Sequence, residues 1–354
     1  MTADADALAA AGHFATAGAI AGVERHAGGH INRSWIVRCA DGPRATRYLL
    51  QRINERVFRR PDLVMENVER VAAHLGEPPA LVRTTGGRGW HVDDIGGHWR
   101  LWTFVEGARS LERPADAGAA YQAGRAFGDF QRRMSSYRGP RLHETIPGFH
   151  DTPARLAALE RAAELDALGR ASLARRELAW AAGRRELAGA LAERQRRGEL
   201  VERVVHNDAK MSNVLLDSAT GEGLCVVDLD TVMPGLSLHD FGDMARSMAA
   251  TADEDEPDAS RMDVRADLFA GAARGYLDGA GDIVSRAERA LLVTAARVIT
   301  FEQGVRFLTD FLLGDRYYPV ARPGHNLDRC RTQLTLVDAF AREEAALMGM
   351  VRHA

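Results

Sequence analysis

Two stretches decide the fold of this chain: HNDAKMSN at His206–Asn213 and CVVDLD at Cys225–Asp230. Between them lie two short apolar runs, at 214–216 and 224–227, which a turn-rich segment with two glycines separates. Apolar runs of this length on either side of such a segment are typical of a β-hairpin. The sequence therefore predicts that the two stretches meet at the open end of a hairpin.

The hairpin would bring Asn213 and Asp228 close together, with Asp208 just outside it. Mg²⁺ is a hard ion that takes oxygen ligands, usually one or two carboxylates together with phosphates and waters. An Asn oxygen and an Asp oxygen from neighbouring segments would meet that need. Phosphoryl transfer requires mainly the positioning of groups and the neutralisation of charge. The pattern therefore predicts a phosphotransferase.

The spacing of these residues agrees with this prediction. In the pattern H-R-D-x-x-x-x-N, the Asp accepts the proton of the substrate hydroxyl and the Asn holds a metal ion. Asp208 and Asn213 have that spacing, with His206 two residues before the Asp. The octet alone is a loose pattern, because an Asp in a loop is usually a turn or cap residue. The hairpin and Asp228 supply the confirming context, so we predict Asp208 as catalytic base and Asn213 and Asp228 as metal ligands.

These residues resemble the catalytic core of the aminoglycoside phosphotransferase and choline kinase superfamily. Five further segments resemble the N-acetylhexosamine 1-kinases within it: Tyr48–Asn54, Val64–Asn67, Val227–Gly235, Asp240–Asp243 and Gly324–Arg329. The matches run from about residue 28 to residue 335. The resemblance implies an α+β, bilobal, protein-kinase-like fold with a small β-rich N-lobe and a large, mostly helical C-lobe. It also implies ATP and Mg²⁺ as cofactors.

Composition excludes several other classes of protein. Of 354 residues, 46% are hydrophobic and 27% are charged, as in a soluble globular protein. The net charge of −3 gives no electrostatic reason to expect nucleic acid or a membrane as partner. Three widely spaced cysteines fit neither a disulfide framework nor a zinc site. We expect a cytoplasmic protein without a signal peptide, with ATP and a small sugar as partners, and either monomeric or homodimeric.

Strand character appears around Ile31–Arg38, Arg47–Arg52 and His98–Val105, and a helical pattern around Pro61–Leu75. The pattern after Gly107 is helical almost throughout. We therefore predict a nucleotide-binding lobe at residues 1–106 and a helical lobe with the catalytic loop and sugar site at residues 107–354. Residues from Pro153 to about Gly198 are expected to form one or two long helices.

The nucleotide phosphates are expected at a glycine-containing loop with Gly28, Gly29 and Asn32, where backbone N–H groups could approach closely. A plain β-turn is the alternative there. Protein kinases use a strand lysine next, but this chain has none in YLLQR. Arg52 could contact the phosphates bidentately, and Gln51 or Arg47 could occupy the position instead.

Two further features complete the predicted nucleotide site. Glu66 resembles the helix glutamate that orients the basic side chain, although it could equally be an ordinary surface residue. The segment WTFVEG resembles the hinge that reads adenine through backbone groups, which places Phe104 and Val105 at the nucleotide. Both residues could instead be ordinary core residues.

The acceptor site is expected near Arg306 and Tyr317, because hexose recognition uses planar hydrogen-bonding groups and an aromatic face; His30 is a weaker candidate. An ion pair with Glu302 at i−4 is the alternative for Arg306. Lys210 either neutralises phosphate charge or is simply solvated. Asp240 resembles the superfamily's structural aspartate, which accepts backbone N–H groups of the catalytic loop.

Three functions follow from these observations. The first is a kinase acting on the anomeric hydroxyl of an N-acetylhexosamine or related amino sugar, with Asp208 also orienting the acceptor. The second is a kinase of the same fold for another acceptor: an amino sugar at a different hydroxyl, an aminoglycoside, choline or homoserine. The third is a catalytically silent nucleotide-binding protein, which only the missing strand lysine favours.

Overall fold

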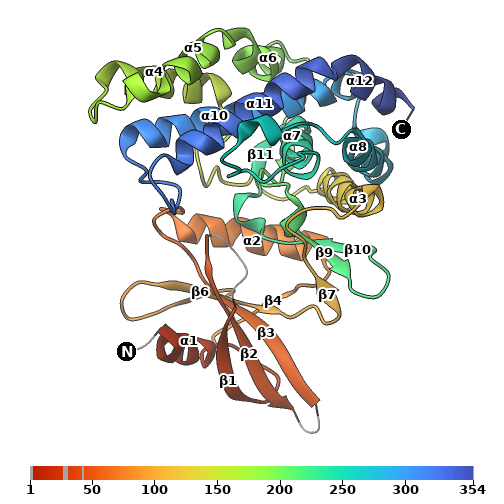
Figure 1. Ribbon diagram of the computed structural model, residues 1–354. Coiled ribbons are helices and arrows are strands. Elements are labelled where there is room, and N and C mark those ends of the chain that lie inside the picture. The colour runs from red at the N-terminus through yellow and green to blue at the C-terminus, as the bar shows by residue number, and fades with distance from the viewer. Residues whose placement is uncertain (1–2, 27–30, 42–43, 354) are drawn as a thin grey trace. The chain divides into compact units, whose positions relative to one another are not determined.

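The structure, a computed structural model, describes residues 3–26, 31–41 and 44–353 (Figure 1). Three of the predicted site residues, Gly28, Gly29 and His30, lie outside the described residues. The chain divides into two compact units. The first comprises Met1–Ala108, Tyr137–Ile146 and Val227–Met233, and the second comprises Arg109–Ser136, Pro147–Val226 and Pro234–Ala354. No pattern in the sequence indicated that the two later segments belong to the first unit.

The first unit is built on a six-stranded antiparallel sheet with the order β1-β2-β3-β6-β4, and β5 pairs with β6. The strands are β1 (Ala19–His26), β2 (Arg33–Asp41), β3 (Arg44–Arg52), β4 (Leu81–Val82), β5 (His91–Val92) and β6 (His98–Thr103). The three predicted strands correspond to β2, β3 and β6 and are confirmed. The prediction missed β1, whose sequence AIAGVERH is mostly exposed and lacks a regular apolar alternation.

Two helices accompany this sheet: α1 (Ala3–Ala11) and α2 (Pro61–Leu75). Small alanines of α1 pack on one face of the sheet against Trp35 and Trp99, whose rings are 5.4 Å apart. The predicted boundaries of α2 are confirmed at both ends. Pro61 starts this helix because the first helical position needs no N–H donor, and Gly76 ends it in the left-handed conformation with a φ of 64°.

The second unit is mostly helical, which confirms the α+β class. Its helices are α3 (Ala117–Met134), α4 (Thr152–Leu165), α5 (Arg175–Ala182), α6 (Arg185–Arg196), α7 (Ser237–Met248), α8 (Ala266–Ala280), α9 (Arg286–Arg289), α10 (Leu292–Leu313), α11 (His325–Arg342) and α12 (Glu344–Arg352). The one or two long helices expected after Pro153 are instead three shorter ones. The first of them stops where Asp166 adopts a left-handed conformation with a φ of 35°.

Glycines determine how closely α3 and α8 approach each other. A Cβ atom built on Gly275 of α8 would lie 2.0 Å from the carbonyl oxygen of Tyr121 in α3. A Cβ on Gly124 of α3 would lie 2.2 Å from the carbonyl oxygen of Ala272. No side chain can replace these glycines without moving the helix backbones apart.

The helix α10 is the centre of the second unit and packs against α4, α7 and α11 (Figure 1). Its buried residues include Phe301, Phe307 and Leu308, which form one core cluster with apolar residues of α4 and α11. Because it is buried along most of its length, its polar residues must find partners inside the protein.

The predicted hairpin is present as β9 (Val214–Asp217) and β10 (Gly223–Val226), with Val214 opposite Val226. Asp217 shapes the turn by accepting hydrogen bonds from the N–H groups of Ala219 and Thr220, both at 2.8 Å. Three further short strands are β7 (Ala108–Arg109), β8 (Arg203–Val205) and β11 (Met233–Gly235).

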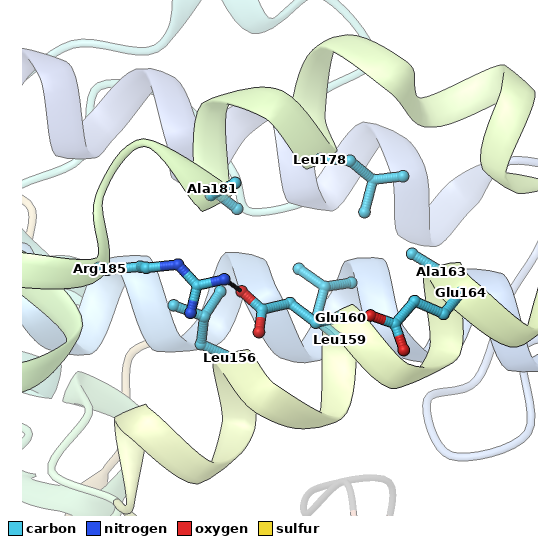
Figure 2. A pocket seen from close by; sticks show the side chains of 9 residues that line it. Leu156, Leu159, Glu160, Ala163, Glu164, Leu178, Ala181 and Arg185 are labelled. Carbon is cyan, nitrogen blue, oxygen red and sulfur yellow. Dashed lines mark ion pairs between the residues drawn. The ribbon is translucent and has the colours of Figure 1, made fainter.

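An open hollow of about 260 Å³ lies among α4, α5 and the start of α6 (Figure 2). Its wall is mostly apolar, and Glu160 and Arg185 form an ion pair there. None of the predicted site residues in the described part of the chain lines this hollow. Across the same described ranges, no helix combines the length and the apolar character needed to cross a membrane.

Candidate active site

The predicted catalytic loop begins where β8 ends, and a buried carboxylate holds its backbone. Asp240 of α7 accepts hydrogen bonds from the N–H groups of His206 at 2.9 Å and Asn207 at 2.7 Å, and also from the Gln131 side-chain amide. The prediction that Asp240 caps the loop is confirmed. Burial raises the pKa of this carboxyl, and the hydrogen bonds oppose that rise.

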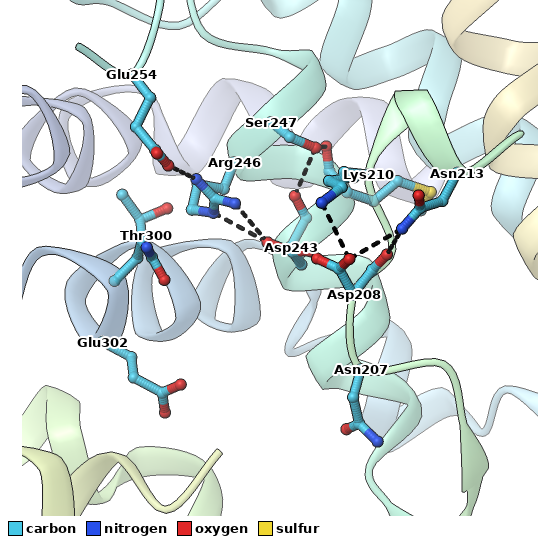
Figure 3. A network of polar contacts seen from close by, with 12 residues as sticks. Asn207, Asp208, Lys210, Asn213, Asp243, Arg246, Ser247, Glu254, Thr300 and Glu302 are labelled. Carbon is cyan, nitrogen blue, oxygen red and sulfur yellow. Dashed lines mark hydrogen bonds and ion pairs between the residues drawn. The ribbon is translucent and has the colours of Figure 1, made fainter. Parts of the chain in front are cut away.

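Asp208 lies at the centre of a small polar cluster (Figure 3). Its carboxylate Oδ2 is 3.0 Å from the Lys210 ammonium and accepts a 3.0 Å hydrogen bond from the Asn213 amide nitrogen. Burial favours the neutral acid, but the charge of Lys210 and these hydrogen bonds outweigh it and hold the pKa of Asp208 below its ordinary value. Asp208 is therefore ionised at neutral pH, and Lys210 is its ion-pair partner rather than a solvated side chain.

Asn213 is oriented in a way that suits a metal ligand. It ends a short 3₁₀ helix, Met211–Asn213, and is 5% exposed. Its Nδ2 donates both to the carbonyl oxygen of Asp208, at 2.8 Å, and to the carboxylate of that residue. Because the amide nitrogen makes these two bonds, the amide oxygen points away from Asp208. A hard cation would use that oxygen.

Asp228 lies two residues after the end of β10 and has a left-handed backbone with a φ of 63°. This conformation is uncommon outside glycine and often occurs at functional sites. Within the described residues, no group of three or more His, Cys, Asp or Glu side chains could hold a metal ion. A site made from one Asn and one Asp would need phosphate and water oxygens as well, which is the usual arrangement for Mg²⁺.

The first unit contains a buried ion pair that sequence analysis did not predict. Arg100 of β6 and Asp230, two residues after Asp228, are 1% and 2% exposed and pair with each other. Arg100 also donates to Gln51 at 2.9 Å, and Asn32 donates to the second oxygen of Asp230 at 2.6 Å. Asn32, expected at the nucleotide, thus has its amide nitrogen bound to Asp230. The only available signal was a second aspartate in the stretch CVVDLD.

The contacts of the side chains separate the three candidates on β3 for the position of the strand lysine. Gln51 faces Arg100 across the ladder and accepts a 3.1 Å hydrogen bond from the Trp102 indole. Arg52 points to the opposite face, where its guanidinium lies 5.5 Å from the Trp99 ring. Arg47 pairs with Glu106 at the surface. Gln51 is therefore the candidate on the side of the buried ion pair.

Glu66 of α2 lies 3.0 Å from Arg70 and 2.8 Å from His143. We expected Glu66 to contact a basic residue of β3. In the structure its carboxylate pairs with Arg70 and His143 instead. Its neighbour Asn67, which the prediction did not single out, is 1% exposed. Asn67 binds the backbone of His143 through both ends of its amide and donates to the carbonyl oxygen of Val232. It thereby attaches both late segments of the first unit to α2.

The predicted hinge residues, Phe104 and Val105, follow β6 and are half-buried, so neither is a plain core residue. The N–H group of Phe104 donates to the carbonyl oxygen of Arg47 at 3.3 Å. The Arg47 guanidinium lies 4.1 Å from the centre of the Phe104 ring.

At the predicted acceptor site, three aromatic rings surround Arg306. Its guanidinium carbon lies 5.3 Å from the ring of Phe149, 5.9 Å from that of Tyr317 and 5.7 Å from that of Tyr318. The structure thus brings the two predicted residues, Arg306 and Tyr317, together. Tyr317 is 55% exposed, so a ligand could reach its ring. The i−4 partner of Arg306, Glu302, instead forms hydrogen bonds to His150 and Thr152.

A buried carboxylate shapes the segment that carries the tyrosines. Asp310 accepts hydrogen bonds from the N–H groups of Arg316, Tyr317 and Tyr318 at 2.9 to 3.0 Å. Asn326, in the segment GHNLDR, donates to the same carboxylate at 3.0 Å. This explains the use of Asn in that motif, a role that no local pattern predicted.

A second charged network lies on α7 (Figure 3). Arg246 pairs with Asp243 at 2.7 Å and with Glu254 at 2.6 Å. Glu254 belongs to an acidic loop, Asp253–Asp258, with the sequence DEDEPD. Asp253, in the same loop, pairs with Arg113 at 2.9 Å. The acidic loop is therefore partly neutralised by arginines rather than fully solvated.

Comparison with known proteins gives a family match and several structures of similar fold. The model of the phosphotransferase enzyme family, APH, matches residues 22–282. An aminoglycoside phosphotransferase from Alicyclobacillus acidocaldarius is 16% identical, with a TM-score of 0.59 over 98% of this chain and 96% of its own. A choline kinase from Cryptosporidium parvum Iowa II is 12% identical, with a TM-score of 0.58 over 93% and 90%.

A third similar structure is the amicoumacin kinase hAmiN, in complex with AMP-PNP, Ca²⁺ and its ligand Ami. It is 12% identical, with a TM-score of 0.55 over 88% of this chain and 87% of its own. At these identities the structures show the fold. They confirm the predicted kinase-like class.

Proposed function

Because the chain belongs to the phosphotransferase enzyme family, we propose that it transfers the γ-phosphoryl group of ATP to the anomeric hydroxyl of an N-acetylhexosamine or a related amino sugar. The products would be ADP and the sugar 1-phosphate. The oxygen of the sugar hydroxyl would bond to the γ-phosphorus while the bond between that phosphorus and the ADP oxygen breaks. Asp208 would accept the proton that the hydroxyl loses.

The ionised Asp208 carboxylate, paired with Lys210 and hydrogen-bonded to Asn213, is the observation that carries this proposal. A catalytic base must be deprotonated at working pH and held in one orientation. In a loose transition state the hydroxyl proton leaves late, so orientation of the acceptor matters as much as basicity. The pair of contacts on one carboxylate oxygen leaves the other oxygen for the acceptor.

Asn213 and Asp228 would hold Mg²⁺, which when bound would neutralise phosphate charge. On the nucleotide side we place Gly28, Gly29 and Asn32 at the phosphates, Glu66 in the supporting helix, and Phe104 and Val105 at the adenine. We retain Arg52 as a candidate for phosphate contact, and Gln51 fits the position of the strand lysine better because it faces Arg100.

The acceptor preference rests on Arg306 and Tyr317, with His30 as a further candidate. An exposed aromatic ring beside a guanidinium can stack on a sugar face and donate hydrogen bonds to its hydroxyl or acetyl oxygens. A polycationic aminoglycoside would instead favour uncompensated acidic groups. Asp253 and Glu254 are paired with Arg113 and Arg246, which argues against that acceptor.

The test is ATP consumption with Mg²⁺ across hexosamines, N-acetylhexosamines, hexoses, aminoglycosides and choline, with phosphorus NMR of any product. A sugar 1-phosphate from an N-acetylhexosamine is the expected result. Another phosphorylated product would overturn the acceptor assignment, and no phosphorylated product from any acceptor would overturn the proposal.

The role of Asp208 has its own test in the Asp208→Asn variant. Turnover should fall by about 10²- to 10⁴-fold or more, because the base is lost, while ATP binding measured by calorimetry stays near normal. Asp282→Asn, at an exposed aspartate, is the matched control. Activity of Asp208→Asn equal to that of the control would contradict the assignment.

A further inference from the structure

A histidine with a buried side chain, two residues before the start of α4, contacts the proposed catalytic loop. His150 has a side chain only 6% exposed, and its Nδ1 lies 2.8 Å from Oε1 of Glu302 in α10. Its Nε2 lies 3.2 Å from the carbonyl oxygen of Asn207, the residue before Asp208. Glu302 is also buried, and its second carboxylate oxygen accepts a 2.6 Å hydrogen bond from the Thr152 hydroxyl.

The two partners of the His150 ring determine its protonation. A carboxylate and a backbone carbonyl can only accept hydrogen bonds, so both ring nitrogens must carry a proton. His150 is therefore an imidazolium. Burial alone would favour the neutral ring, but the charge and hydrogen bond of Glu302 outweigh it and raise the pKa of His150 above its ordinary value.

The peptide between Asn207 and Asp208 is held at both ends by imidazole rings. Its carbonyl oxygen faces Nε2 of His150, and its N–H group donates to Nδ1 of His206 at 3.3 Å. An Nδ1 that accepts a hydrogen bond is unprotonated, so the two histidines act in opposite ways on one peptide group. Asn207 has a left-handed φ of 64°, a conformation that needs such support.

We propose that His150, charged by Glu302, is a positioning residue that fixes the peptide of Asp208 and thereby the direction of its carboxylate. Asp240 of α7 binds the N–H groups of His206 and Asn207, and His150 binds the carbonyl group of Asn207 that follows them. A general base must be held within a narrow range of orientations to act efficiently. The inference rests on the proposed role of Asp208.

Several titratable groups face His150 from the helices packed around it. From α10 come Glu302 and Arg306, and from α7 come Asp243 and His239. Asp243 supports the charge of His150, whereas Arg306 opposes it. The His239 ring lies 4.8 Å from that of His150, and burial with the neighbouring imidazolium lowers the pKa of His239 to about 3. His239 is therefore neutral, and His150 is the ring that forms an ion pair with Glu302.

The variant Glu302→Gln tests the proposal, because it removes the negative charge beside His150 and keeps a side chain of nearly the same size. A Gln oxygen can still accept a hydrogen bond from His150, but the negative charge that stabilises the imidazolium is gone. The alkaline fall of kcat should then begin at lower pH than in wild type. At a pH above that fall, kcat should drop by about 10- to 100-fold while KM for ATP stays within about twofold.

Thr152→Val is the matched control, since it removes the other hydrogen bond of Glu302 and leaves its charge. We expect a loss of stability in this variant and an unchanged pH profile. Equal pH profiles for wild type and Glu302→Gln, with both proteins folded by circular dichroism, would overturn the proposal.

A second readout needs no acceptor substrate. In ¹⁵N-histidine-labelled protein, His150 should show two protonated ring nitrogens at neutral pH, assigned by their loss in His150→Gln. In Glu302→Gln these signals should titrate at lower pH than in wild type. A neutral His150 ring at pH 6 in wild type would overturn the inference. Failure of the acceptor panel alone would overturn the proposed function and leave this readout intact.

Discussion

Each unit of the molecule contains a buried aspartate close in sequence to the predicted site, and these two carboxylates, Asp230 and Asp240, are satisfied in different ways. In the first unit, Asp230 is 2% exposed and faces the guanidinium of Arg100. In the second, Asp240 is 0% exposed, and its three hydrogen-bond donors are uncharged amide groups. The carboxylate of Asp230 is thus neutralised by a positive charge, whereas that of Asp240 is stabilised by amide N–H groups.

This difference separates two tasks. A buried ion pair is costly to break but gives little net stability compared with apolar side chains of the same size. Backbone N–H groups pointed at one carboxylate fix the path of the chain, which a catalytic loop requires. Asp230 thus connects a side chain of β6 with one from the segment before β2, whereas Asp240 shapes one loop. Variants of Asp230 and Asp240 test whether the two carboxylates have these different roles.

The largest effect on stability is expected for Asp230→Asn. The substitution keeps the shape but leaves the guanidinium of Arg100 buried without its countercharge, which costs about 3–5 kcal/mol. Urea unfolding at neutral pH measures this loss. A loss below about 1 kcal/mol would mean that water or another group already compensates Arg100.

A double-mutant cycle supplies the control. Adding Arg100→Met to Asp230→Asn removes the stranded charge, so the double variant should recover most of the lost stability. If the double variant is no more stable than the single one, the two residues do not act as a pair.

A smaller effect is expected for Asp240→Asn. An amide has one acceptor oxygen, so one loop N–H group loses its partner, at a cost of about 1–3 kcal/mol. Asp217→Asn is the matched control, because Asp217 also accepts two backbone N–H groups but sits in an exposed turn. Urea unfolding should rank Asp240→Asn clearly below this control in stability.

The pH dependence gives Asp240 a second signature. Because burial raises its pKa, the folded protein binds the proton more tightly than the unfolded chain does. Its contribution to stability therefore falls as pH rises from the ordinary carboxyl range through the raised value. Asp240→Asn should lack that decline. If both proteins keep the same slope of unfolding free energy against pH, Asp240 does not titrate as described.

Much of the catalytic loop could be predicted from sequence because its chemistry is local. Asp208 and Asn213 lie five residues apart, and the hairpin between the two stretches is marked by apolar runs around a turn. The cap by Asp240 was predicted from resemblance, since neither spacing nor burial marks an aspartate in a helix as a loop cap.

The partners missed by the prediction are distant in sequence. Arg100 and Asp230 are 130 residues apart, and His150 and Glu302 are 152 residues apart. An arginine in a strand looks solvated from sequence, and a glutamate four residues before an arginine suggests a helix-face ion pair. Only tertiary packing, which buries Arg100 and turns Glu302 toward His150, reveals the actual partners.

The smallest effect is expected for Glu106→Gln. Arg47 and Glu106 form a bidentate pair, but unlike Arg100 and Asp230 they lie at the surface, where their side chains are 33% and 59% exposed. Water already solvates both charges, so the loss should stay below about 1 kcal/mol and shrink further at high salt. Urea unfolding at low and high salt, run beside Asp230→Asn, measures the contrast within one unit. If Glu106→Gln costs as much stability as Asp230→Asn, burial does not determine how much an ion pair of this protein costs to break. The buried charge of Asp230 would then need no special treatment compared with an exposed one.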